Sequence, residues 1–431
     1  MPVRPKVVIL GGGFAGLRVL KDLDKDLYEV HLVDRNNYHS FPPLFYQVAS
    51  SGLDPTDISF PFRRRLRQKR MKDARFHLGE VKSVDMYRRT VITDNETIGF
   101  DILVIAMGTT NNFFGNPDLV DKVYTLKSTG EAIRLRNEVL YRCERAAIEK
   151  DPVKRKKMLT FAVIGGGPAG VEVAGAMGEL KRYVISRDFP ELSPLDITIH
   201  LIEGSDRLLR TMSIAASQTA LADLGKLMVN ITLNRTMKSY DGNVITLDDG
   251  TTIECGLVTW TAGVKAVPFD ITGIDNPDTL FGHGGRIITD DRCRVKGLEG
   301  VFAIGDIGIF ESDSYPHGLP QLAQVAIQAG AYAAQCLNSK SWTKPFSYKD
   351  KGSMATIGRN KAVADIKGTH LSGFTAWLAW MFIHLISLLG MRSKLTVLLN
   401  WTWAYFTYNT ALRLLLKGSK YPLRGDLDDN G

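Results

Sequence analysis

An α/β fold is predicted for this chain of 431 residues by a glycine-rich segment that occurs twice. Residues 9–16 read ILGGGFAG and residues 163–170 read VIGGGPAG; each copy follows a β-branched apolar run and leads into a helix-like segment. Such glycines allow a tight strand-to-helix turn and let a pyrophosphate approach the backbone. An almost uncharged stretch follows residue 368. We therefore expect two Rossmann-like dinucleotide-binding domains, the second inserted in the first, plus a C-terminal membrane-attachment region.

The first glycine turn lies in a predicted strand–turn–helix–strand unit. The unit comprises a buried strand over Lys6–Leu10, a helix beginning over Ala15–Lys21 and a second strand over Glu29–Val33 that ends at Asp34. Asp34 lies 18 residues after Gly16, close to the spacing of about 20 at which a carboxylate meets a ribose hydroxyl. The alternative is a surface Asp that ends a strand.

The segment after the second strand contains an apolar part and a basic part. Phe41–Pro55 is too apolar for a free loop, whereas Arg63, Arg64, Arg65, Arg70 and Lys72 form a basic run. That run is either a solvated helix face or a contact with an anionic surface. Further on, we expect antiparallel strands around turns and then a buried strand. The antiparallel strands are Ala74–Val84, Thr90–Ile92 and Ile98–Phe100, and the buried strand is Ile102–Ala106.

A second unit of the same kind surrounds the second glycine turn. A Ser-capped helix over Ser128–Lys150 and a charged linker over Asp151–Lys157 precede it, and a strand over Thr198–Ile202 follows and ends at Glu203. Glu203 lies 33 residues after Gly170 because Tyr183–Pro194 is inserted between them. A carboxylate there can bond both hydroxyls of an unphosphorylated ribose and would repel a 2′-phosphate, which favours NADH over NADPH.

The part of the chain between Glu203 and the almost uncharged C-terminal stretch is predicted to contain short strands and one helix. We expect a hairpin strand over Val244–Leu247, a strand over Leu257–Trp260 that precedes Gly263, and a strand over Val301–Ile304 that precedes Gly305-Asp306. Gln321–Asn338 reads as a helix that carries Gln324 and Gln328 on one face. Its small residues suit either a planar ligand or close packing of an Ala-rich helix.

Composition limits the kinds of partner and site. The net charge is +8 and the pI is near 9.1, which favours an anionic partner. No nucleic-acid recognition motif is present, so anionic membrane lipid is preferred to nucleic acid. The four cysteines form no CxxC pair, so neither a local zinc site nor a dithiol motif is expected, and we predict no metal. The apolar run Val7–Leu10 is too short for a secretory signal, which predicts a cytoplasmic nucleotide-binding body.

The C-terminal region has the composition of a membrane-bound segment. Gly368–Met391 and Leu395–Leu412 contain no Asp, Glu, Lys or Arg. Two sets of residues predict an apolar and a polar face in the second stretch: Leu398, Trp401, Tyr405, Tyr408 and Leu412 against Thr396, Asn400, Thr407 and Thr410. We expect helices that lie in the membrane plane, with Trp377, Trp380, Trp401, Trp403, Tyr405 and Tyr408 at the headgroups and Arg413, Lys417, Lys420 and Arg424 on anionic lipid. A true span and a buried dimer interface are the alternatives.

Three segments are more specific than the glycine turns: Pro42–Pro55 (PPLFYQVASSGLDP), Ala323–Gly330 (AQVAIQAG) and Met354–Ala364 (MATIGRNKAVA). With the Trp-rich tail, the chain resembles the type II NADH dehydrogenases, single-chain flavoproteins of the two-dinucleotide-binding-domain superfamily that reduce membrane quinone. The resemblance implies a respiratory NADH:quinone oxidoreductase. Nothing in the sequence resembles a transmembrane channel or a chain of buried ionisable groups, so we expect electron transfer without proton pumping. The resemblance also implies a homodimer on the cytoplasmic face of the cell membrane.

The resemblance further implies roles for individual residues. FAD would be bound non-covalently by Gly11, Gly13, Ala15, Gly16, Asp34, Arg35, Val81, Gly305, Asp306, Ala323 and Gln324. NADH would be bound by Gly165, Gly167, Gly170, Glu203 and Gly263, with Glu172 as the catalytic residue. We also hypothesise that Gln324 and Gln328 bind the quinone. The FAD-binding domain would span residues 1–120 and 286–345, the NADH-binding domain 121–285 and the membrane-anchoring region 346–431.

Two other functions stay open at the level of the sequence. A sulfide:quinone oxidoreductase would need reactive cysteines, and Cys143 and Cys336 are far apart in the chain, although the fold can bring such residues together. A redox-sensing flavoprotein would oxidise NADH only slowly, with a turnover well below ~1 s⁻¹.

Overall fold

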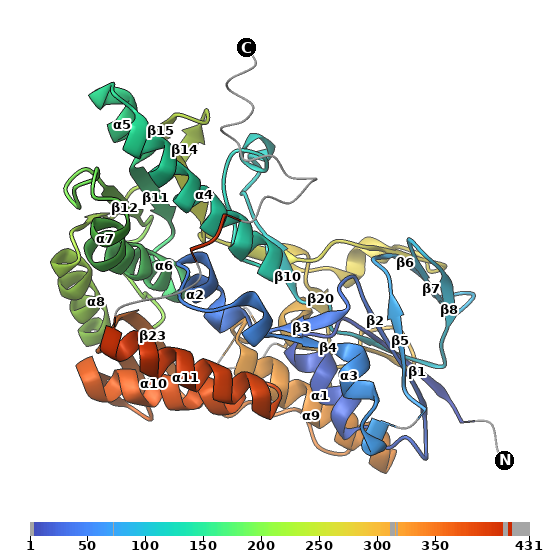
Figure 1. The fold of residues 1–431 in the computed structure, drawn as a ribbon. Coiled ribbons are helices and arrows are strands. Elements are labelled where there is room, and N and C mark those ends of the chain that lie inside the picture. The colour runs from blue at the N-terminus through green and yellow to red at the C-terminus, as the bar shows by residue number, and fades with distance from the viewer. Residues whose placement is uncertain (1–3, 72, 311–314, 316–317, 408–412, 416–431) are drawn as a thin grey trace. The chain divides into compact units, whose positions relative to one another are not determined.

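The computed structural model describes residues 4–71, 73–310, 315, 318–407 and 413–415. The chain forms two compact units (Figure 1). Unit 1 comprises residues 1–40, 60–110 and 264–350, and unit 2 comprises residues 41–59, 111–263 and 351–431. Each unit therefore contains one of the two glycine turns. The ranges predicted to bind FAD, NADH and membrane stay predictions, because they concern what each part binds.

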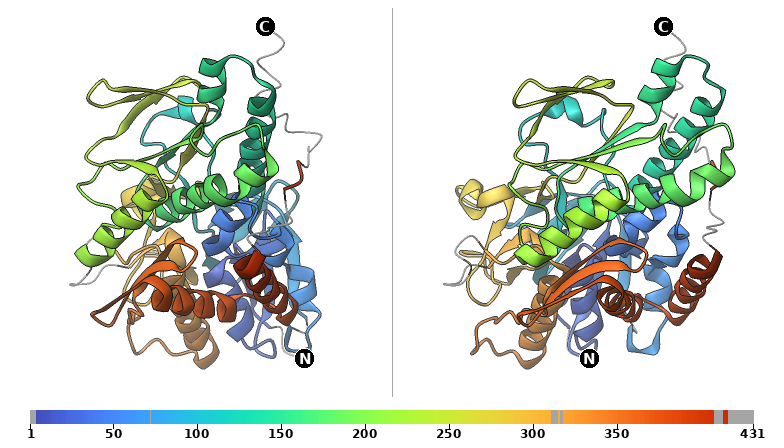
Figure 2. Two further views of the ribbon diagram at one scale, coloured as in Figure 1. Left: turned by 60° about the vertical axis from the view of Figure 1, so that its left-hand side comes forward. Right: turned by 90° about the vertical axis from the view of Figure 1, so that its left-hand side faces the viewer.

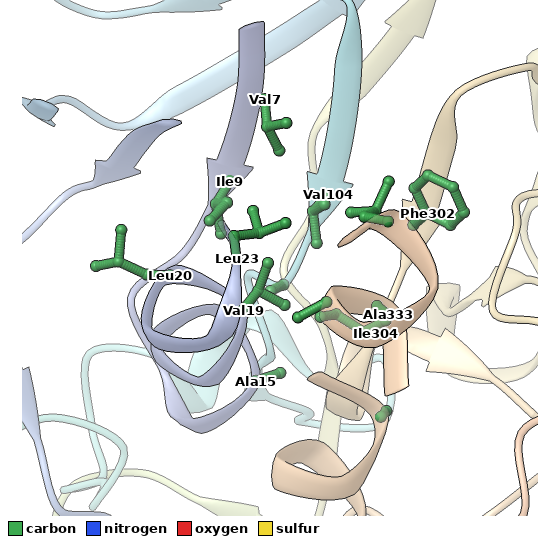
Figure 3. Close-up of a cluster of buried hydrophobic side chains, with 14 of the residues drawn as sticks. Val7, Ile9, Ala15, Val19, Leu20, Leu23, Val104, Phe302, Ile304 and Ala333 are labelled. Atoms are coloured by element: carbon green, nitrogen blue, oxygen red, sulfur yellow. The ribbon is translucent and has the colours of Figure 1, made fainter. Parts of the chain in front are cut away.

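Unit 1 is built on a five-stranded parallel sheet with the strand order β21-β9-β1-β2-β5 (Figure 1). Its strands are β1 (Lys6–Leu10), β2 (Glu29–Asp34), β5 (Arg75–Leu78), β9 (Ile102–Ile105) and β21 (Val301–Ala303). Helices α1 (Phe14–Asp22) and α9 (Ala323–Ser339) pack against each other. Their apolar side chains form one buried cluster with the strands, in which Val19 of α1 lies near Ile9 and Val104 (Figure 3). Burial of this cluster holds the first glycine turn between β1 and α1.

A second sheet of unit 1 corrects one prediction. It contains β6 (Val81–Asp85), β7 (Thr90–Thr93) and β8 (Thr97–Gly99), which are antiparallel as expected, and β19 (Asp270–Thr272), which is parallel to β6. The predicted single antiparallel strand Ala74–Val84 is wrong, because its first half, β5, pairs in parallel with β2. The two halves separate at Gly79, whose N–H donates to the Asp34 carbonyl.

Unit 2 is built on a four-stranded parallel sheet with the strand order β13-β12-β11-β17 (Figure 1). Its strands are β11 (Thr160–Ile164), β12 (Thr198–Ile202), β13 (Val229–Thr232) and β17 (Leu257–Trp260). An antiparallel sheet of β14 (Met237–Tyr240), β15 (Val244–Leu247) and β16 (Thr252–Glu254) accompanies it. The longer helices are α4 (Thr129–Ile148), α6 (Pro168–Glu179) and α8 (Ile214–Lys226), and a π-helix over Leu180–Ile185 follows α6.

The helix caps of unit 2 confirm one prediction and correct another. Ser128 caps α4 as predicted, since its hydroxyl accepts the Glu131 N–H at 3.1 Å. Asp151–Lys157 is not a linker, because it forms most of α5 (Pro152–Met158). Asp151 accepts the Val153 N–H at 2.9 Å, and Pro152 occupies the first helical position. An Asp cap followed by Pro is a strong helix start, which the high charge of the segment obscured.

The C-terminal part of unit 2 forms a small sheet and two helices. The sheet contains β23 (Ser353–Gly358), β24 (Lys361–Ile366) and β25 (Thr369–Ser372), and α10 (Gly373–Ser387) packs on β24 beside α11 (Met391–Thr407) (Figure 2). No helix in the part of the chain that the structure describes is long and apolar enough to cross a membrane.

The faces of α11 differ from the predicted ones. Asn400 and Trp401 point into unit 2, where the Asn400 amide donates to Asp57 at 3.0 Å and the Trp401 indole donates to Gln47 at 2.8 Å. The outer side chains are large and apolar: Leu395, Leu398, Leu399, Trp403 and Phe406 are all exposed. The predicted assignment of apolar and polar faces is therefore wrong, because Asn400 of the predicted polar face and Trp401 of the predicted apolar face both point inward to hydrogen-bond partners. The hydroxyls of Thr396 and Thr407 donate to carbonyls of α11 itself. Tyr408, Thr410, Leu412, Lys417, Lys420 and Arg424 lie outside the described residues.

Three predicted interfacial residues are also placed differently. Trp380 and Trp401 are buried within unit 2 and so are not at an outer surface. Arg413 forms an ion pair with Asp188 at 2.7 Å.

The shorter segments complete the fold. They are α2 (Phe45–Ala49), α3 (Phe62–Leu66), α7 (Ser186–Asp188), β3 (Tyr38–Ser40), β4 (Ser59–Pro61), β10 (Thr109–Asn111), β18 (Val264–Ala266), β20 (Ile287–Ile288) and β22 (Gly308–Ile309), with short 3₁₀ turns that include η2 (Pro55–Asp57) and η8 (Gly305–Ile307).

Candidate nucleotide sites and cavity

The glycine turn of unit 1 is closed by a carboxylate. A Cβ on Gly16 would lie 1.9 Å from the Gly11 carbonyl oxygen, so helix α1 can start this close to β1 only with glycine there. The Asp34 carboxylate accepts N–H groups from Gly12 and Asn36, each at 2.7 Å. Burial raises the pKa of Asp34, and the two N–H groups oppose that rise. A Cβ on Gly13, the N-cap of α1, would meet nothing within 4 Å, which leaves room for a phosphate beside the helix N-terminus.

His39 supports this turn and was not predicted from the sequence. Its Nδ1 lies 2.9 Å from the Gly12 carbonyl oxygen, and burial lowers its pKa to about 4. The ring is therefore neutral at pH 7 and donates to that carbonyl. No local sequence signal links a His on β3 to a turn 27 residues earlier.

The Gly305-Asp306 pair meets the same turn inside unit 1. A Cβ on Gly305 would lie 3.2 Å from the Ala15 Cβ and 3.3 Å from the Ala326 Cβ, so η8 packs against the starts of α1 and α9. Asp306 accepts from the Gln321 side-chain amide through its carbonyl at 3.1 Å. Four other residues were predicted to bind FAD. In the structure Val81 begins β6, the exposed Arg35 follows β2, and Ala323 and Gln324 begin α9.

The glycine turn of unit 2 repeats this geometry. A Cβ on Gly170 would lie 1.7 Å from the Gly165 carbonyl oxygen, and one on Gly167, the N-cap of α6, would meet nothing within 4 Å. The Glu203 carboxylate accepts the Gly166 N–H through one oxygen and the Ser205 N–H and hydroxyl through the other. Gly263 packs on the Phe114 ring, which a Cβ would approach to 2.6 Å.

Helix α6 leads from this turn to a cavity of about 180 Å³ that lies entirely within unit 2. Side chains from α2, α6, the π-helix, β23, α10 and α11 line it. Two carboxylic acids, Glu172 and Glu179, stand two helical turns apart on α6 and so on one face of it. Most of the remaining wall is aromatic or aliphatic, so both acids face a poorly hydrated space.

Glu172 is held against β23. A Cβ on Gly175 would lie 2.0 Å from the Ile357 carbonyl oxygen, so glycine allows α6 to approach β23 this closely. As a result, the Thr356 N–H donates to Glu172 at 3.4 Å. Burial raises the pKa of Glu172 to about 8, and this hydrogen bond opposes the rise. Most Glu172 side chains are therefore protonated at pH 7.

Glu179 lies at the other end of the cavity wall. It accepts the Arg359 N–H at 2.5 Å, and the Arg359 guanidinium stacks 4.3 Å above the Tyr405 ring. Burial raises the pKa of Glu179, which Arg359 and Lys361 oppose. Burial also raises the pKa of Tyr46, and negative charge on either glutamate adds to that rise. The Tyr46 phenol is thus within electrostatic reach of both acids.

Polar side chains connect the aromatic wall to α2. The Trp401 indole donates to the Gln47 carbonyl at 2.8 Å, and the Gln47 amide donates to the Tyr46 hydroxyl at 2.8 Å. On α10, the Trp380 ring stacks on His384 with ring centres 4.1 Å apart. Burial lowers the pKa of His384 to about 4, so this ring is neutral at pH 7.

Comparison with known proteins agrees with both parts of this arrangement. The pyridine nucleotide-disulphide oxidoreductase family matches residues 5–330, and the NDH2 C-terminal domain matches residues 351–407. The type II NADH:quinone oxidoreductase Ndh of Mycobacterium tuberculosis is 34% identical over 422 residues, which cover 94% of this chain and 89% of that protein. Its relative NdhA from the same organism is 35% identical over 414 residues, with 92% and 86% covered. This chain belongs to the type II NADH:quinone oxidoreductase family.

A solved structure shares the fold of this family member. The NDH2 structure from Plasmodium falciparum in complex with NADH superposes with a TM-score of 0.87 at 21% identity, and the match covers 96% of this chain and all of that one. The predicted α/β fold is thereby confirmed.

The two glutamines that we hypothesised to bind quinone, Gln324 and Gln328, lie in unit 1. The Gln328 amide donates to the Lys349 carbonyl at 2.9 Å, and its carbonyl accepts the Lys349 N–H at 3.0 Å. The Gln324 amide lies 3.4 Å from the Asp350 carboxylate. Neither residue lines the cavity of unit 2. Their role stays a prediction.

Several cavity residues of this type II enzyme fold were missed in the sequence. Glu179 could have been found, because it follows Glu172 by seven residues on a helix. Tyr46, Gln47 and Arg359 lie inside two of the three family-specific segments, Pro42–Pro55 and Met354–Ala364, but no spacing rule connects those segments to α6.

Proposed function

We propose that the protein oxidises NADH and reduces a membrane quinone, using non-covalently bound FAD. The observation that carries this proposal is the course of α6. Its N-terminus forms the phosphate-binding turn of unit 2, and its next two turns place Glu172 and Glu179 on the cavity. One rigid helix thus connects a nucleotide site with a cavity able to hold an apolar molecule that takes up protons.

Unit 1 fits FAD. The space at Gly13 suits a pyrophosphate, Asp34 suits the adenosine ribose and Asp306 suits the sugar-alcohol chain, since η8 packs on Ala15. The other FAD contacts proposed are Gly11, Ala15, Gly16, Arg35, Val81, Gly305, Ala323 and Gln324. Bound FAD would supply two-electron transfer between NADH and quinone. The protein would hold it and orient it.

Unit 2 fits NADH. Gly165, Gly167 and Gly170 would receive the pyrophosphate, Glu203 the ribose hydroxyls, and Gly263 the dinucleotide near the end of β17. Because Glu203 is fixed by Gly166 and Ser205, its carboxylate cannot easily move away from a 2′-phosphate. We therefore propose a preference for NADH over NADPH.

The cavity would receive the quinone, whose reduction takes up two protons. Glu172 is protonated at pH 7 and can donate one to a quinone oxygen. Glu179 would resupply it, and the Tyr46 phenol lies within electrostatic reach of both acids. The proposed quinone contacts of Gln324 and Gln328 require both amides to leave their present partners near residues 349–350.

The redox cycle itself tests this proposal. The purified protein should be yellow, NADH should bleach it under anaerobic conditions, and a soluble quinone should restore the colour. NADPH should bleach it far more slowly. A colourless protein, or one that NADH bleaches and quinone does not recolour, would contradict the proposal.

Membrane attachment is proposed from α10 and α11. Their outer faces expose Phe374, Leu378, Phe382, Ile383, Ile386, Leu395, Leu398, Leu399, Trp403 and Phe406. An apolar patch of this kind suits helices that lie in the headgroup region. We propose monotopic attachment to anionic lipid on the cytoplasmic face of the cell membrane, as a homodimer. We further propose that turnover pumps no protons, so sealed vesicles that hold only this enzyme should not acidify with NADH and quinone.

The rival functions have less support. A sulfide:quinone oxidoreductase needs reactive thiolates, but burial raises the pKa of all four thiols, those of Cys143 and Cys255 to about 12. Sulfide should therefore fail to bleach the protein. A redox sensor that oxidises NADH slowly would not require two acids beside an apolar cavity. A turnover of ~1 s⁻¹ or more with soluble quinone would exclude this function.

A further inference from the structure

A basic groove in unit 1 takes no part in the function proposed above. Its volume is about 840 Å³, and α3 and β5 supply most of its walls. Four guanidinium groups line it, those of Arg63, Arg64, Arg67 and Arg75, and all four residues are exposed. We call these four residues the arginine groove. It contains no residue of the glycine turn, so it is separate from the proposed FAD site.

Aromatic rings hold two of the guanidinium groups. Arg63 lies 5.3 Å above the ring of Phe76, which is buried on β5, and Arg64 lies 5.7 Å above the ring of Phe60. A guanidinium that stacks on a ring is restrained in orientation while its N–H edges stay available for hydrogen bonds. The groove therefore offers partly ordered donors.

Three of the four guanidinium groups have no acidic partner among the described residues. No carboxylate lines it, and within the described residues none forms an ion pair with Arg63, Arg64 or Arg67. One neighbouring acid, Glu29, pairs with the groove residue Arg75 at 3.8 Å and also accepts from His31 at 2.9 Å. The other two have partners outside the four arginines, since Glu96 contacts His77 at 2.9 Å and Asp73 pairs with Arg4 at 3.6 Å.

A solvated helix end explains only part of this arrangement. Basic residues in the last turn of α3 are favoured by the helix dipole. That effect does not explain Arg75, which comes from β5 and lines the same groove. Four like charges around one groove repel each other, and a bound anion would relieve the repulsion.

We propose that the arginine groove binds a phosphate group, as a monoester or a diester. Guanidinium groups bind phosphate oxygens in pairs of parallel N–H···O bonds, and several of them around one groove match the tetrahedral anion. The phosphate can belong to a lipid headgroup or to a soluble anion, since both present the same oxygens. In the first case, unit 1 has an electrostatic membrane contact of its own, independent of α10 and α11.

The test compares charge reversal in the groove with equal reversal elsewhere. Arg63→Glu with Arg64→Glu changes the groove, and Lys154→Glu with Lys156→Glu changes two exposed positions of α5 by the same charge. Both proteins are prepared full length with flavin bound, and bleaching by NADH checks their folding. Binding is measured to neutral phosphatidylcholine vesicles, to vesicles that also contain phosphatidylglycerol, and to inorganic phosphate with NAD⁺ saturating.

Groove reversal should weaken binding to the anionic vesicles by at least roughly thirtyfold, since each basic residue lost near such a surface removes a factor of about five and the two new carboxylates add repulsion. Binding to neutral vesicles should not change, and the α5 variant should resemble the wild type. Phosphate binding that only the groove variant loses would identify a soluble anion as the source. Equal weakening by both variants, without phosphate binding, would overturn the proposal.

A charge-conserving variant keeps the test decisive if charge reversal prevents folding. Arg63→Lys with Arg64→Lys retains the charge but loses the paired donors and the ring stacking. If the groove coordinates phosphate, this variant should bind anionic vesicles or phosphate several-fold more weakly. Binding equal to that of the wild type would show that only net charge acts, and would overturn the site.

Discussion

Two glycines at equivalent places should separate the two nucleotide sites. In Gly16→Ala, the new Cβ would lie 1.9 Å from the Gly11 carbonyl oxygen, and in Gly170→Ala 1.7 Å from the Gly165 carbonyl oxygen. Both force a helix away from its turn. We expect Gly16→Ala to be purified without flavin. Gly170→Ala should keep its yellow colour and bind NADH at least about tenfold more weakly, a loss of about 1.4 kcal/mol. Absorption at the flavin band and NADH titration measure this, and a Gly170→Ala protein without flavin would contradict the assignment.

Glu172 should set the alkaline limit of quinone reduction. Its pKa is raised to about 8, so the acid form falls as pH rises through 8. We expect quinone turnover by the wild type to decline above that pH. Glu172→Gln should lower kcat by roughly 100-fold and lose this alkaline limb, because the amide has no proton to give.

Measuring the reduction by NADH and the reoxidation by quinone separately shows which step Glu172→Gln impairs. Anaerobic bleaching of Glu172→Gln by NADH should proceed at the wild-type rate, and recolouring by quinone should be slow. Glu191→Gln removes an exposed carboxylate and is the control. An unchanged pH profile in Glu172→Gln would refute the proton-donor role.

The carboxylates beside the turns could be predicted because they are local to their strands. Asp34 and Glu203 each end the strand that follows a glycine turn, and in the structure each accepts an N–H from its turn. The residues of the cavity could not be predicted in this way, because they are not local to one segment of the chain. Tyr46, Glu179 and Arg359 come from three distant segments, and only the packing of α6 on β23 and α2 brings them together.

At the scale of elements, the docking of α11 should depend on pH. Asp57 of η2 accepts from Asn400 of α11, and burial, with a smaller effect of Asp54, raises the pKa of Asp57 to about 6. The pKa of Asp57 is therefore higher in the folded protein than its value of about 4 in the unfolded chain. Its contribution to the free energy of unfolding is then greatest below pH 4 and is lost as pH rises through 6. Asp57→Asn keeps a hydrogen-bond acceptor without the charge.

The Asp57→Asn variant should therefore gain stability over the wild type as pH rises from 4 to 8. The gain should be at most about 3 kcal/mol, and each kcal/mol corresponds to roughly 2–4 °C in Tm. Thermal unfolding at pH 4 and pH 8 measures it, with Asp118→Asn, an exposed carboxylate of unit 2, as the control. An equal Tm difference at both pH values would mean that Asp57 does not titrate in this range.

Helices and strands could be predicted where a single sequence pattern, such as a short apolar run, indicates them. The buried strands β1, β12 and β17 are short apolar runs, and their predicted positions match the structure closely. Errors arose where two signals compete. The high charge of Asp151–Lys157 led us to predict a linker, although the segment contains the capped start of α5. The residues of β5 predict a strand, but they do not show that it pairs in parallel with β2.

For the whole molecule, the question is what the outer faces of α10 and α11 contact. Phe382, Leu399 and Phe406 are 64%, 67% and 77% exposed, which is unfavourable in water unless another apolar phase covers them. Each buried side chain of this size contributes about 1.5–3 kcal/mol. Changing all three to Ser should thus weaken binding to lipid vesicles by at least about 100-fold. Turnover with a soluble quinone should persist, because none of the three lines the cavity.

A matched variant distinguishes membrane contact from general loss of apolar surface. Ile148, Val153 and Leu195 are 75%, 65% and 80% exposed and lie in unit 2 outside α10 and α11. Their change to Ser should leave vesicle binding as in the wild type. If the α10–α11 variant kept its vesicle binding but changed from dimer to monomer in solution, a second copy of the chain would be what covers these helices. The proposed membrane attachment would then be wrong, since the same apolar area cannot face both.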